Sequence, residues 1–468
     1  MMPTIYPVTC HTDHVGSGST FVVIQGFAHN GCAYIASALQ KGATMIVVDQ
    51  ELSPELYTQI KKQGAGVMRV HDARKALAQL SAQASDHAHK KLKLIGITGT
   101  KGKTTTAHLL FHMLKTAGMR VGLLSTVGNA IGDSRFAPSL TTPQPDYLHQ
   151  FFQHAVQQQC EWIVMEVAAQ AISLHRIDGL QFDAIIMTNF DREHLEFYDS
   201  MESYFADKVA LLNYRKAGVP AWINRDDAWL SGIESSGIHW FSSSMPAELS
   251  GSACSSSNFT LAADVFYQGA SARLQCPTLS GAYNFSNILA ALGGAITAGL
   301  SMHDAAQAVS TFAGVAGRQE RIQLANGATA IIDYAHNPQS YRAFFQTVRS
   351  YTDHLIVIFG AGGNRDQGKR PEMGAVVAQY ADQIIITTDN PRHENPDQIV
   401  AGIMQGISSE KHDRVIYEPD RAKAIEKAYA LSRSGSLIAL LGKGPDEYQL
   451  IGNLKIPFSE RKILLSQH

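Results

Sequence analysis

A glycine-rich loop between an apolar run and a helical pattern constrains the fold of this 468-residue chain more than any other feature. The apolar run at residues 94–97 is followed by Gly99 and Gly102, and residues 104–116 have the pattern of a helix that closes at Gly118. Glycine permits the backbone turns that direct amide groups toward phosphate oxygens, and a helix N-terminus adds a partial positive charge. The sequence therefore predicts a phosphate-binding loop on a strand–loop–helix unit.

Two side chains of this loop have the chemistry that a nucleoside triphosphate requires. Lys103 can reach the β- and γ-phosphates, and Thr104 can offer a hydroxyl group to Mg²⁺. The spacing departs from the common Gly-x4-Gly-Lys form, and ATPases, kinases and ligases all use such loops, so the loop alone does not identify a reaction. The loop residues that we predict to bind ATP are Gly99, Thr100, Lys101, Gly102, Lys103, Thr104 and Thr105.

Apolar runs alternate with helical patterns along the rest of the chain, which indicates α/β architecture with parallel sheets. We predict a small N-terminal α/β domain over residues 1–91, a central phosphate-loop ATPase-like domain over 92–316 and a Rossmann-like domain over 317–468. The Ser-rich stretch 241–258 is predicted to be a surface loop between short strands. The apolar runs expected to form the two large sheets are 94–97, 121–124, 162–165, 184–187, 330–332, 355–359, 384–386 and 437–441.

The composition excludes several classes of protein. Apolar residues make up 45% and charged residues 17% of the chain, as in a globular protein with sizeable cores. The net charge of −2 argues against a broad nucleic-acid-binding surface, and no apolar run has the roughly 18–20 residues of a membrane span. The five scattered cysteines and the absence of a signal-like pattern at the N-terminus favour a reducing cytoplasm.

Three further residues could belong to a nucleotide site. Glu166 ends the apolar run 162–165, and His194 follows the run 184–187, so both fall where ligands gather in open α/β sheets. They could share a Mg²⁺ ion, although this ion prefers oxygen ligands and an isolated histidine is weak evidence. Lys208 lies in a predicted helix at 201–212; by itself it reads as an ordinary solvated lysine.

Taken together, the ordered motifs of the chain resemble those of the Mur ligase family, the ATP-dependent amide ligases of peptidoglycan synthesis. The resemblance covers nearly the whole sequence and supports the three predicted domains. Its most specific parts are Gly-Thr-Lys-Gly-Lys-Thr-Thr at 99–105, Asp-Tyr-Ala-His-Asn-Pro at 333–338 and Asp-Asn-Pro-Arg at 389–392. Other matching segments are 141–143, 165–167, 194–196, 201–208, 224–227, 283–287, 317–321, 368–371 and 442–444.

The resemblance implies a reaction in which ATP phosphorylates a substrate carboxylate and an amino acid then displaces the phosphate. It also assigns roles near the phosphate loop. Lys103 would hold the phosphates, Thr104 and Glu166 would bind one Mg²⁺ ion, and His194 would help to bind a second. Lys208 would be carbamylated by CO₂, which turns a cation into an anion that can bind or orient Mg²⁺. Catalysis would be mainly positioning and charge neutralisation, completed by domain closure.

The resemblance also implies contacts from the later part of the chain. Asn284 would contact adenine, Arg318 and Asp333 would bind ATP, and His336 would lie beside that site as a catalytic residue. Arg318 could equally be an ordinary salt-bridge residue between domains.

The motif at 389–392 resembles the form that family members use for meso-diaminopimelate, the third residue of the stem peptide. Arg392 can pair with the distal carboxylate of this amino acid, whereas the ammonium group of a lysine substrate would be repelled. Arg365 would hold a second part of the same amino acid; taken alone, Arg392 could be a surface arginine. The predicted amino-acid-binding residues are Arg365, Asp389, Asn390, Arg392, Gly442 and Asp446.

Departures from the family pattern are concentrated on the residues expected to bind the acyl substrate. His-Thr-Asp at 11–13 replaces the usual Asp-Ser-Arg, and Ala-Ala-Gln at 168–170 replaces Ser-Ser-His. Lys101 stands where the family usually has Asn, and Gly-Pro-Asp-Glu at 444–447 replaces Gly-His-Glu-Asp, so a carboxylate role falls on the shorter Asp446. The predicted acyl-substrate residues that remain are Thr12, Thr141, Thr142 and Arg176.

Two functions stay open on these residues. One is a divergent ligase of peptidoglycan precursor synthesis that joins UDP-N-acetylmuramoyl-dipeptide to meso-diaminopimelate, and Thr141, Thr142 and Arg176 favour it. The other is a paralogue that joins a different carboxylate and amino acid. A nucleotide-regulated binding protein, a simple kinase and a folylpolyglutamate-type ligase fit the motifs less well. In either favoured case we expect a cytoplasmic, monomeric enzyme with ATP, Mg²⁺ and small-molecule substrates, and with no nucleic-acid or membrane partner.

Overall fold

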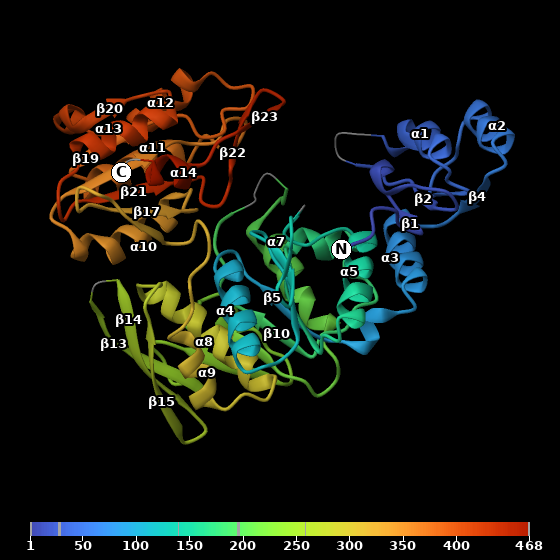
Figure 1. The fold of residues 1–468 in the computed structure, drawn as a ribbon, viewed down its shortest axis with the longest axis horizontal. Helices are drawn as coiled ribbons and strands as arrows, with labels where there is room; N and C mark the ends of the chain where they lie inside the picture. Colours follow the sequence, from blue (N-terminus) through green and yellow to red (C-terminus); the bar gives the residue numbers. More distant parts are fainter. Residues whose placement is uncertain (1, 27–29, 139, 194–196, 258, 467–468) are drawn as a thin grey trace. The chain divides into compact units, whose positions relative to one another are not determined.

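The computed structural model describes residues 2–26, 30–138, 140–193, 197–257 and 259–466 (Figure 1). The chain forms two compact units, one of Met1–Phe241 and Ala290–Leu300, and one of Ser242–Leu289 and Ser301–His468. Parallel β-sheet with helices packed on it is the main element of both units.

The first unit begins with a small parallel sheet in the order β1-β2-β3-β4. Alternate side chains of its strands face opposite sides, so Phe21 and Ile46 pack with α1 and α2 while Val22 and Val47 pack with α3. Both faces are therefore buried, as expected for parallel strands. The elements are β1 Val8–Thr9, β2 Thr20–Val22, α1 Ile35–Gln40, β3 Met45–Val48, α2 Pro54–Lys62, β4 Gly66–Arg69 and α3 Ala73–Ala84.

The central sheet of the first unit has the strand order β12-β11-β10-β5-β9-β6-β7-β8 and is parallel from β12 to β6. Its strands are β5 Lys93–Thr98, β6 Val121–Leu124, β7 Asn129–Ile131, β8 Ser134–Phe136, β9 Trp162–Glu166, β10 Ala184–Met187, β11 Ala221–Asn224 and β12 Ile238–Ser242. Its helices are α4 Lys103–Thr116, α5 Pro145–Gln157, α6 Ala169–Ser173 and α7 Met201–Val209. Strand β5 lies between β10 and β9, so the loops that follow these three strands share one edge of the sheet.

The second unit opens with three antiparallel strands, β13 Leu249–Ser257, β14 Thr260–Tyr267 and β15 Ala270–Cys276. The prediction of a surface loop over the whole Ser-rich stretch is therefore wrong in its second half, which forms β13. Pairing with β14, which has one register shift between Ala253 and Ser255, overrides the weak strand propensity of serine. Helix α8 Ala282–Thr297 then passes from the second unit into the first, and α9 Met302–Val309 packs on β15.

The sheet in the rest of the second unit has the order β16-β17-β21-β18-β19-β20 and is parallel except for β16. Apolar clusters bury both of its faces, and the hairpin of β22 and β23 follows β21 in the chain. The strands are β16 Glu320–Gln323, β17 Thr329–Asp333, β18 Leu355–Phe359, β19 Gln383–Ile386, β20 Val415–Tyr417, β21 Leu437–Leu441, β22 Tyr448–Ile451 and β23 Leu454–Pro457. The helices are α10 Pro338–Val348, α11 Arg370–Tyr380, α12 Pro396–Met404, α13 Arg421–Leu431 and α14 Glu460–Leu465.

The predicted α/β class and the eight apolar strands of the two large sheets are confirmed, each strand within one residue of its expected bounds. The predicted helix at 201–212 is shorter, because α7 ends at Val209 and a 3₁₀ turn continues to Tyr214. The domain boundaries at 91 and 316 stay predictions.

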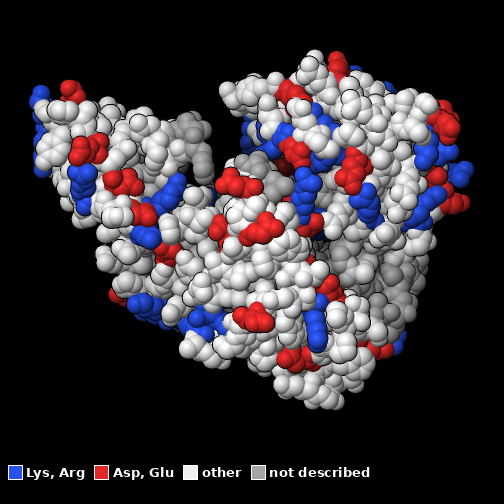
Figure 2. Space-filling model, turned by 180° about the vertical axis from the view of Figure 1, so that it is seen from behind, with Lys and Arg blue, Asp and Glu red and all other residues white. Residues whose placement is uncertain are grey.

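Charges on the surface are mixed. In Figure 2, Lys and Arg side chains are interspersed with Asp and Glu on the face that is drawn, without one large patch of either sign. Of the helices in the described part of the chain, none is both long and apolar enough to cross a membrane.

The contact between Gly293 of α8 and Trp222 of β11 gives a test of the first unit's packing. A Cβ atom at Gly293 would lie 2.6 Å from Cδ2 of Trp222, an indole that is 2% exposed. We expect Gly293→Ala to lower the free energy of unfolding by about 1–2 kcal/mol, because overpacking outweighs the gain in helix propensity. Urea unfolding measures this. Gly232→Ala is the control, since nothing lies within 4 Å of the added Cβ atom. If the Gly293→Ala chain is as stable as this control, the close packing of Gly293 against Trp222 is contradicted.

Candidate active site

The phosphate loop lies between β5 and α4, where tight backbone turns require glycine. Gly102 has a φ of 82° and precedes Lys103, the first residue of α4. Gly99 has a φ of 147°, and a Cβ atom there would overlap Oγ1 of Thr188. Lys103 Nζ donates to the carbonyl oxygens of Gly99 at 2.7 Å and Thr100 at 3.0 Å. The loop thus combines a helix N-terminus with an ammonium group folded onto the loop, the arrangement expected for binding phosphate.

Glu166, the last residue of β9, is fully buried beside this loop. Its Oε2 accepts hydrogen bonds from Oγ1 of Thr104 at 3.0 Å and Oγ1 of Thr126 at 3.2 Å, and its Oε1 accepts one from the backbone N–H of Thr126 at 2.9 Å. Mg²⁺ prefers oxygen ligands and retains several waters, so a carboxylate and two hydroxyls suit it. Thr126 was not anticipated from the sequence, because it belongs to no motif and reaches Glu166 only through the neighbouring strand β6.

Lys208 is the most deeply buried cation of the first unit, with 2% of its surface exposed. Its Nζ donates to the same Gly99 carbonyl as Lys103, at 2.9 Å, and lies 4.6 Å from the ring centroid of Tyr204. Burial, and then repulsion by Lys103, lowers the pKa of Lys208 well below its ordinary value. The side chain is therefore predisposed to be a neutral amine rather than the solvated ammonium that its sequence context alone suggested.

A hydrogen-bonded path leads from Glu166 to two predicted acyl-substrate residues. Oγ1 of Thr142 donates to the carbonyl of Glu166 at 3.0 Å, and Oγ1 of Thr126 lies within hydrogen-bonding distance of Oγ1 of Thr141, at 3.0 Å. Arg176 donates to the carbonyl of Thr142 at 3.1 Å, while its buried Nε has no hydrogen-bond partner among the residues that the structure describes. Thr141, Thr142 and Arg176 are thus brought together beside Glu166.

The N-terminal sheet is tied to the helix that follows Thr142. Asp146 of α5 accepts hydrogen bonds from Oγ1 of Thr9 at 2.8 Å and from the backbone N–H of Cys10 at 3.2 Å. Thr12 lies two residues farther along, and its carbonyl accepts a hydrogen bond from Lys41. The segment with the altered 11–13 motif is therefore anchored to the same helix.

In the second unit, Gln319 connects several predicted ATP-binding residues. Its backbone N–H donates to Oδ2 of Asp333 at 2.8 Å, and its Oε1 accepts a hydrogen bond from Nδ2 of Asn284 at 3.0 Å. Burial raises the pKa of Asp333, although two backbone N–H groups and Arg318 act against the rise. The guanidinium of Arg318 lies 4.4 Å from the ring centroid of Tyr334. Asn284, Arg318 and Asp333 are thus brought together by a glutamine that sequence reasoning did not select.

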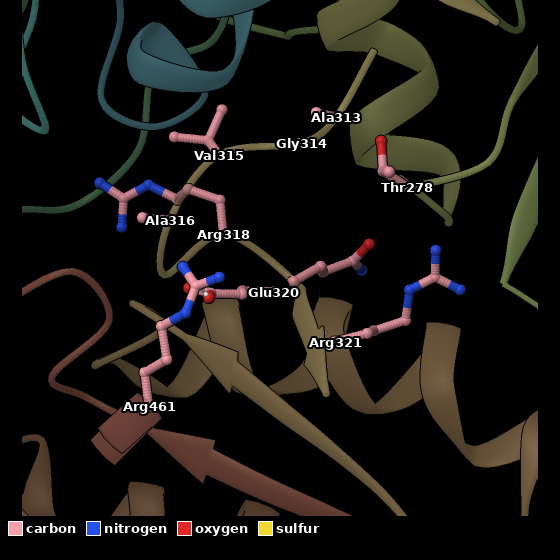
Figure 3. A pocket seen from close by; sticks show the side chains of 10 residues that line it. Thr278, Ala313, Gly314, Val315, Ala316, Arg318, Glu320, Arg321 and Arg461 are labelled. Carbon is pink, nitrogen blue, oxygen red and sulfur yellow. Dashed lines mark ion pairs between the residues drawn. The ribbon is translucent and has the colours of Figure 1, made fainter. Parts of the chain in front are cut away.

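His336 lies close to this cluster. Its Nδ1 is 2.7 Å from the carbonyl of Tyr334, and the two rings have centroids 5.0 Å apart. Figure 3 shows a pocket of about 310 Å³ beside the same segment, lined by Arg318, Glu320, Arg321 and Arg461 among others. Arg461 pairs with Glu320 at 2.8 Å, and Arg318 and Arg321 extend away from one another.

The loops that follow β18, β19 and β21 bring together the predicted amino-acid-binding residues. Asp389 is 8% exposed, and Lys443, which is fully buried, lies 3.4 Å from Oδ1 of Asp389 and 3.1 Å from Oδ1 of Asn390. A Cβ atom at Gly442 would lie 2.9 Å from Oδ2 of Asp389, so the loops approach closely. Burial raises the pKa of Asp446, while Lys443 acts in the opposite direction. Lys443 was part of a recognised motif but was not selected as a site residue.

Arg392 is held in an unusual backbone conformation next to a second arginine. Its φ is 52°, and its Nη1 donates to the carbonyl of Gly363 at 2.9 Å. Hydrogen bonds of its backbone with Leu450 and Gly452 fix it against the β22–β23 hairpin. A Cβ atom at Gly362 would lie 3.1 Å from Nη1 of Arg392 and 3.6 Å from Cγ of Arg365, so the two side chains flank the same glycine. Burial, and then Arg365, lowers the pKa of Arg392. Two neighbouring cations on these loops suit a carboxylate ligand.

A buried ion pair connects the two loops that carry these arginines. Arg370 and Glu394 form hydrogen bonds of 2.6 and 2.8 Å, and their side chains are only 4% and 9% exposed. Glu394 also accepts the backbone N–H of Asn364 at 2.9 Å, next to Arg365. Neither partner of the pair was selected as a site residue, although Arg370 belongs to the matching segment 368–371.

His194 lies outside the described residues, as do Leu195 and Glu196. In the part of the chain that the structure describes, no group of three or more His, Cys, Asp or Glu side chains is arranged to hold a metal ion. The metal roles predicted for Thr104, Glu166, His194 and Lys208 stay predictions.

Comparison with known families agrees with this geometry. Residues 97–295 match the model of the Mur ligase middle domain, residues 317–444 that of the Mur ligase glutamate ligase domain, and residues 4–85 that of the Mur ligase family catalytic domain. The chain belongs to the Mur ligase family. It is accordingly an ATP-dependent amide ligase with the three-part Mur ligase architecture, as the sequence motifs predicted.

Two similar relatives are named UDP-N-acetylmuramoyl-L-alanyl-D-glutamate--2,6-diaminopimelate ligase. The one from Caldanaerobacter subterraneus subsp. tengcongensis is 36% identical over 95% of this chain and 90% of its own length. The one from Chlorobaculum tepidum is 36% identical over 98% of this chain and 91% of its own length. A solved structure with the same enzyme name has a TM-score of 0.67 at 25% identity and covers 99% of this chain and 94% of its own. MurF from Acinetobacter baumannii shares the fold, with a TM-score of 0.70 at 17% identity. The match covers 98% of this chain and 93% of that structure's chain.

The buried Arg370–Glu394 pair gives a test of the loop architecture in this Mur ligase. We expect Glu394→Gln to lower the free energy of unfolding of the second unit by about 2–3 kcal/mol, because Arg370 stays buried without its carboxylate. Thermal or urea unfolding measures the loss. The control is Glu372→Gln in the exposed Arg342–Glu372 pair, 2.8 Å apart and 44% and 54% exposed, which should cost less than about 1 kcal/mol. If the two substitutions lower the free energy of unfolding equally, the buried pair does not stabilise the loops more than an exposed pair does.

Proposed function

We propose that this Mur ligase joins UDP-N-acetylmuramoyl-L-alanyl-D-glutamate to meso-diaminopimelate in peptidoglycan precursor synthesis. The observation that carries the proposal is that Arg392 and Arg365 both flank Gly362, within 4 Å of where a Cβ atom there would stand. The buried Asp389–Lys443 pair belongs to the neighbouring loops. The names of relatives 36% identical over nearly the whole chain support it. We further propose that the enzyme acts as a monomer in the cytoplasm, on small-molecule substrates alone.

In this proposal the phosphate loop binds ATP and the buried carboxylate beside it binds Mg²⁺. Lys103 and the amides of α4 would neutralise the phosphates. Thr104 and Glu166 would hold one Mg²⁺ ion, and His194 would help to hold a second. Mg²⁺ bound there would neutralise the charge of the phosphates during transfer. Thr126 orients Glu166, since it donates hydrogen bonds to both carboxylate oxygens.

Lys208 has a different role from Lys103 although both contact Gly99. Its lowered pKa makes the neutral amine available, and a neutral amine adds to CO₂ to give a carbamate with release of one proton. The product carries a negative charge beside the loop and can help to bind or orient Mg²⁺. Carbamylation also removes the repulsion between two neighbouring ammonium groups.

The chemistry then follows from the poor electrophilicity of a carboxylate. An oxygen of the substrate carboxylate attacks the γ-phosphorus of ATP, ADP leaves, and an acyl phosphate forms. The amine of the amino acid attacks the acyl carbon, loses a proton, and phosphate departs with one of the original carboxylate oxygens. The chain contributes charge neutralisation and positioning rather than a covalent intermediate of its own.

For the amino acid, the proposal places the distal carboxylate of meso-diaminopimelate on Arg392 and another part of the molecule on Arg365. Asp389, Asn390, Gly442 and Asp446 line the same loops. Lysine lacks the distal carboxylate, so it would bring an ammonium group near the two cations without the anion that pairs with them, which selects against lysine.

The alternative function keeps the same chemistry with a different acid. It is favoured by Ala168, Ala169 and Gln170, which lack the two hydroxyl groups of the usual motif. It is also favoured by the exposed Asp13, which pairs with Lys41 at 3.5 Å where the family usually has a cation. The retained contacts of Thr142 with Glu166 and Arg176 favour the first function.

A substrate panel separates the two functions. We expect ATP-dependent phosphate release with UDP-N-acetylmuramoyl-L-alanyl-D-glutamate and meso-diaminopimelate together, and little with either alone or with lysine. Oxygen-18 in the substrate carboxylate should appear in the released phosphate. Turnover with another carboxylic acid but not with the nucleotide-linked dipeptide would reject the first function in favour of the second.

Replacement of Arg392 tests amino-acid recognition. We expect Arg392→Ala to raise the KM for meso-diaminopimelate by roughly 10- to 100-fold, because a charge-assisted pair is lost, with a smaller effect on the KM for ATP. Steady-state kinetics at saturating acyl substrate measures both. Arg342→Ala, at an exposed arginine of α10, is the control. Unchanged preference between diaminopimelate and lysine in Arg392→Ala would remove this residue from specificity.

Carbamylation of Lys208 is tested directly by ¹³C NMR with labelled bicarbonate. We expect a carbamate signal in the wild type and in Lys115→Met, and none in Lys208→Met, which should lose about 10²-fold or more in kcat. Because only the neutral amine reacts, the signal should weaken as the pH falls through the lowered pKa of Lys208. A wild-type protein with full activity and no such signal at any pH would exclude the modification.

A further inference from the structure

A fully buried ion pair joins the first residues of α13 and α14 in the second unit. Arg421 begins α13 and Glu460 begins α14, and their side chains are 0% and 2% exposed. Nε of Arg421 donates to Oε1 of Glu460 at 2.8 Å, and Nη2 lies 2.7 Å from the same oxygen. A buried ion pair is seldom more stabilising than apolar side chains of similar volume, so stability alone does not account for these two charges.

The pair contacts the end of the strand that leads into the amino-acid loops. Nη2 of Arg421 donates at 3.0 Å to the carbonyl of Leu441, the last residue of β21. Lys443 follows two residues later, and its buried ammonium group lies 3.1 Å from Oδ1 of Asn390 and 3.4 Å from Oδ1 of Asp389. Arg421 and Lys443 are thus two buried cations that hold neighbouring points of one turn.

The groups that face Lys443 include a second cation as well as several acids. The charged and titratable side chains around it come from α13, α14, the β22–β23 hairpin and the amino-acid loops, and they are Arg421, Glu460, Tyr448, Asp389 and Asp446. Burial lowers the pKa of Lys443; Asp389 acts against the fall and Arg421 adds to it. Because an arginine stays protonated in proteins, Lys443 keeps its own proton more readily when the charge of Arg421 is offset.

We propose that Glu460 is a positioning residue for amino-acid binding: it offsets the charge of Arg421 so that Lys443 stays protonated. Protonated Lys443 in turn holds Asp389 and Asn390, which begin the loop expected to bind the amino acid. The inference rests on the proposed function, because that loop is the proposed site of meso-diaminopimelate. A neutral Lys443 would hold the loop less firmly, since its charge-assisted contact with Asp389 is lost.

Glu460→Gln tests the proposal, because it removes the offsetting charge and nearly keeps the size of the side chain. Loss of a nearby negative charge lowers the pKa of Lys443, so its proton leaves at a lower pH. The fall of kcat/KM for meso-diaminopimelate at high pH, the basic limb, should therefore move down by about one pH unit. Between the two limbs kcat/KM should be roughly tenfold below the wild type. Steady-state kinetics at saturating ATP and acyl substrate, over about pH 6 to about pH 10, measures the limb.

Removal of Arg421 as well should reverse the shift. In the double variant Arg421→Met with Glu460→Gln, the cation beside Lys443 is gone, so the basic limb should return to the wild-type pH or lie above it. Neutral side chains of similar volume often replace a buried ion pair without loss of stability, so this chain is expected to fold. If Glu460→Gln does not fold, the double variant is compared with the wild type directly, and a limb below the wild-type pH contradicts the inference.

A carboxylate–arginine pair at the other end of β19 provides the matched control. Asp382 directly precedes β19, whereas Asp389 follows it, and Asp382 pairs with Arg349 at 2.9 Å. Asp382→Asn should leave the basic limb unchanged. The profile of kcat/KM for ATP, measured at saturating amino acid, should not move in any variant. Ionisation of the amino acid itself contributes equally to every profile, because the same substrate is used throughout.

The outcomes separate a positioning role from a purely structural one. A structural pair would lower activity with ATP and with the amino acid alike, and would leave the basic limb of Glu460→Gln at the wild-type pH; either result overturns the inference. A double variant whose limb coincides with that of Glu460→Gln overturns it as well. If the wild type ligates another amino acid but not meso-diaminopimelate, the proposed function is overturned, and the profiles measured with that amino acid decide the role of Glu460.

Discussion

The close approach of Gly99 to Thr188 is the constraint on which the nucleotide site depends. Because no Cβ atom fits there, the phosphate loop lies directly against the segment that follows β10. This contact leaves the Gly99 carbonyl facing two lysines, Lys103 and Lys208, which both donate to it. It also places Lys101 beside Asp191. A side chain at position 99 would separate the loop from β10 and disrupt these three lysine environments together.

Lys103 and Lys208 illustrate how burial gives two identical side chains different chemistry. Lys103 stands at the N-terminus of α4 and is partly exposed, as suits a cation that meets phosphate. Lys208 is enclosed by the loop and Tyr204, and burial lowers its pKa. The structure therefore places two lysines in different environments against the same carbonyl oxygen.

In the second unit, buried charged side chains hold the loops that carry Arg365 and Arg392. The ammonium group of Lys443 contacts the side chains of Asp389 and Asn390. The Arg370–Glu394 pair connects the loops of Arg365 and Arg392. Buried ion pairs contribute little net stability, but removing one partner is costly, so they hold a loop in one arrangement. In the first unit, Thr142 and Arg176 keep their contacts around Glu166 although the residues after Glu166 differ from the usual motif.

The sequence by itself determined the α/β class, the strands of both large sheets and the glycine turn between β5 and α4, because apolar period and glycine spacing are local properties. Ordered motifs were enough to identify the family and to select Lys103, Glu166, Arg392 and Asp389. Only the tertiary structure decided which side chains lie beside them. Thr126 reaches Glu166 from a neighbouring strand, Gln319 links Asn284 to Asp333, and the serine-rich strand β13 forms because β14 pairs with it. The lowered pKa of Lys208 likewise depends on burial, which is a property of the packed chain and not of the residues next to it in sequence.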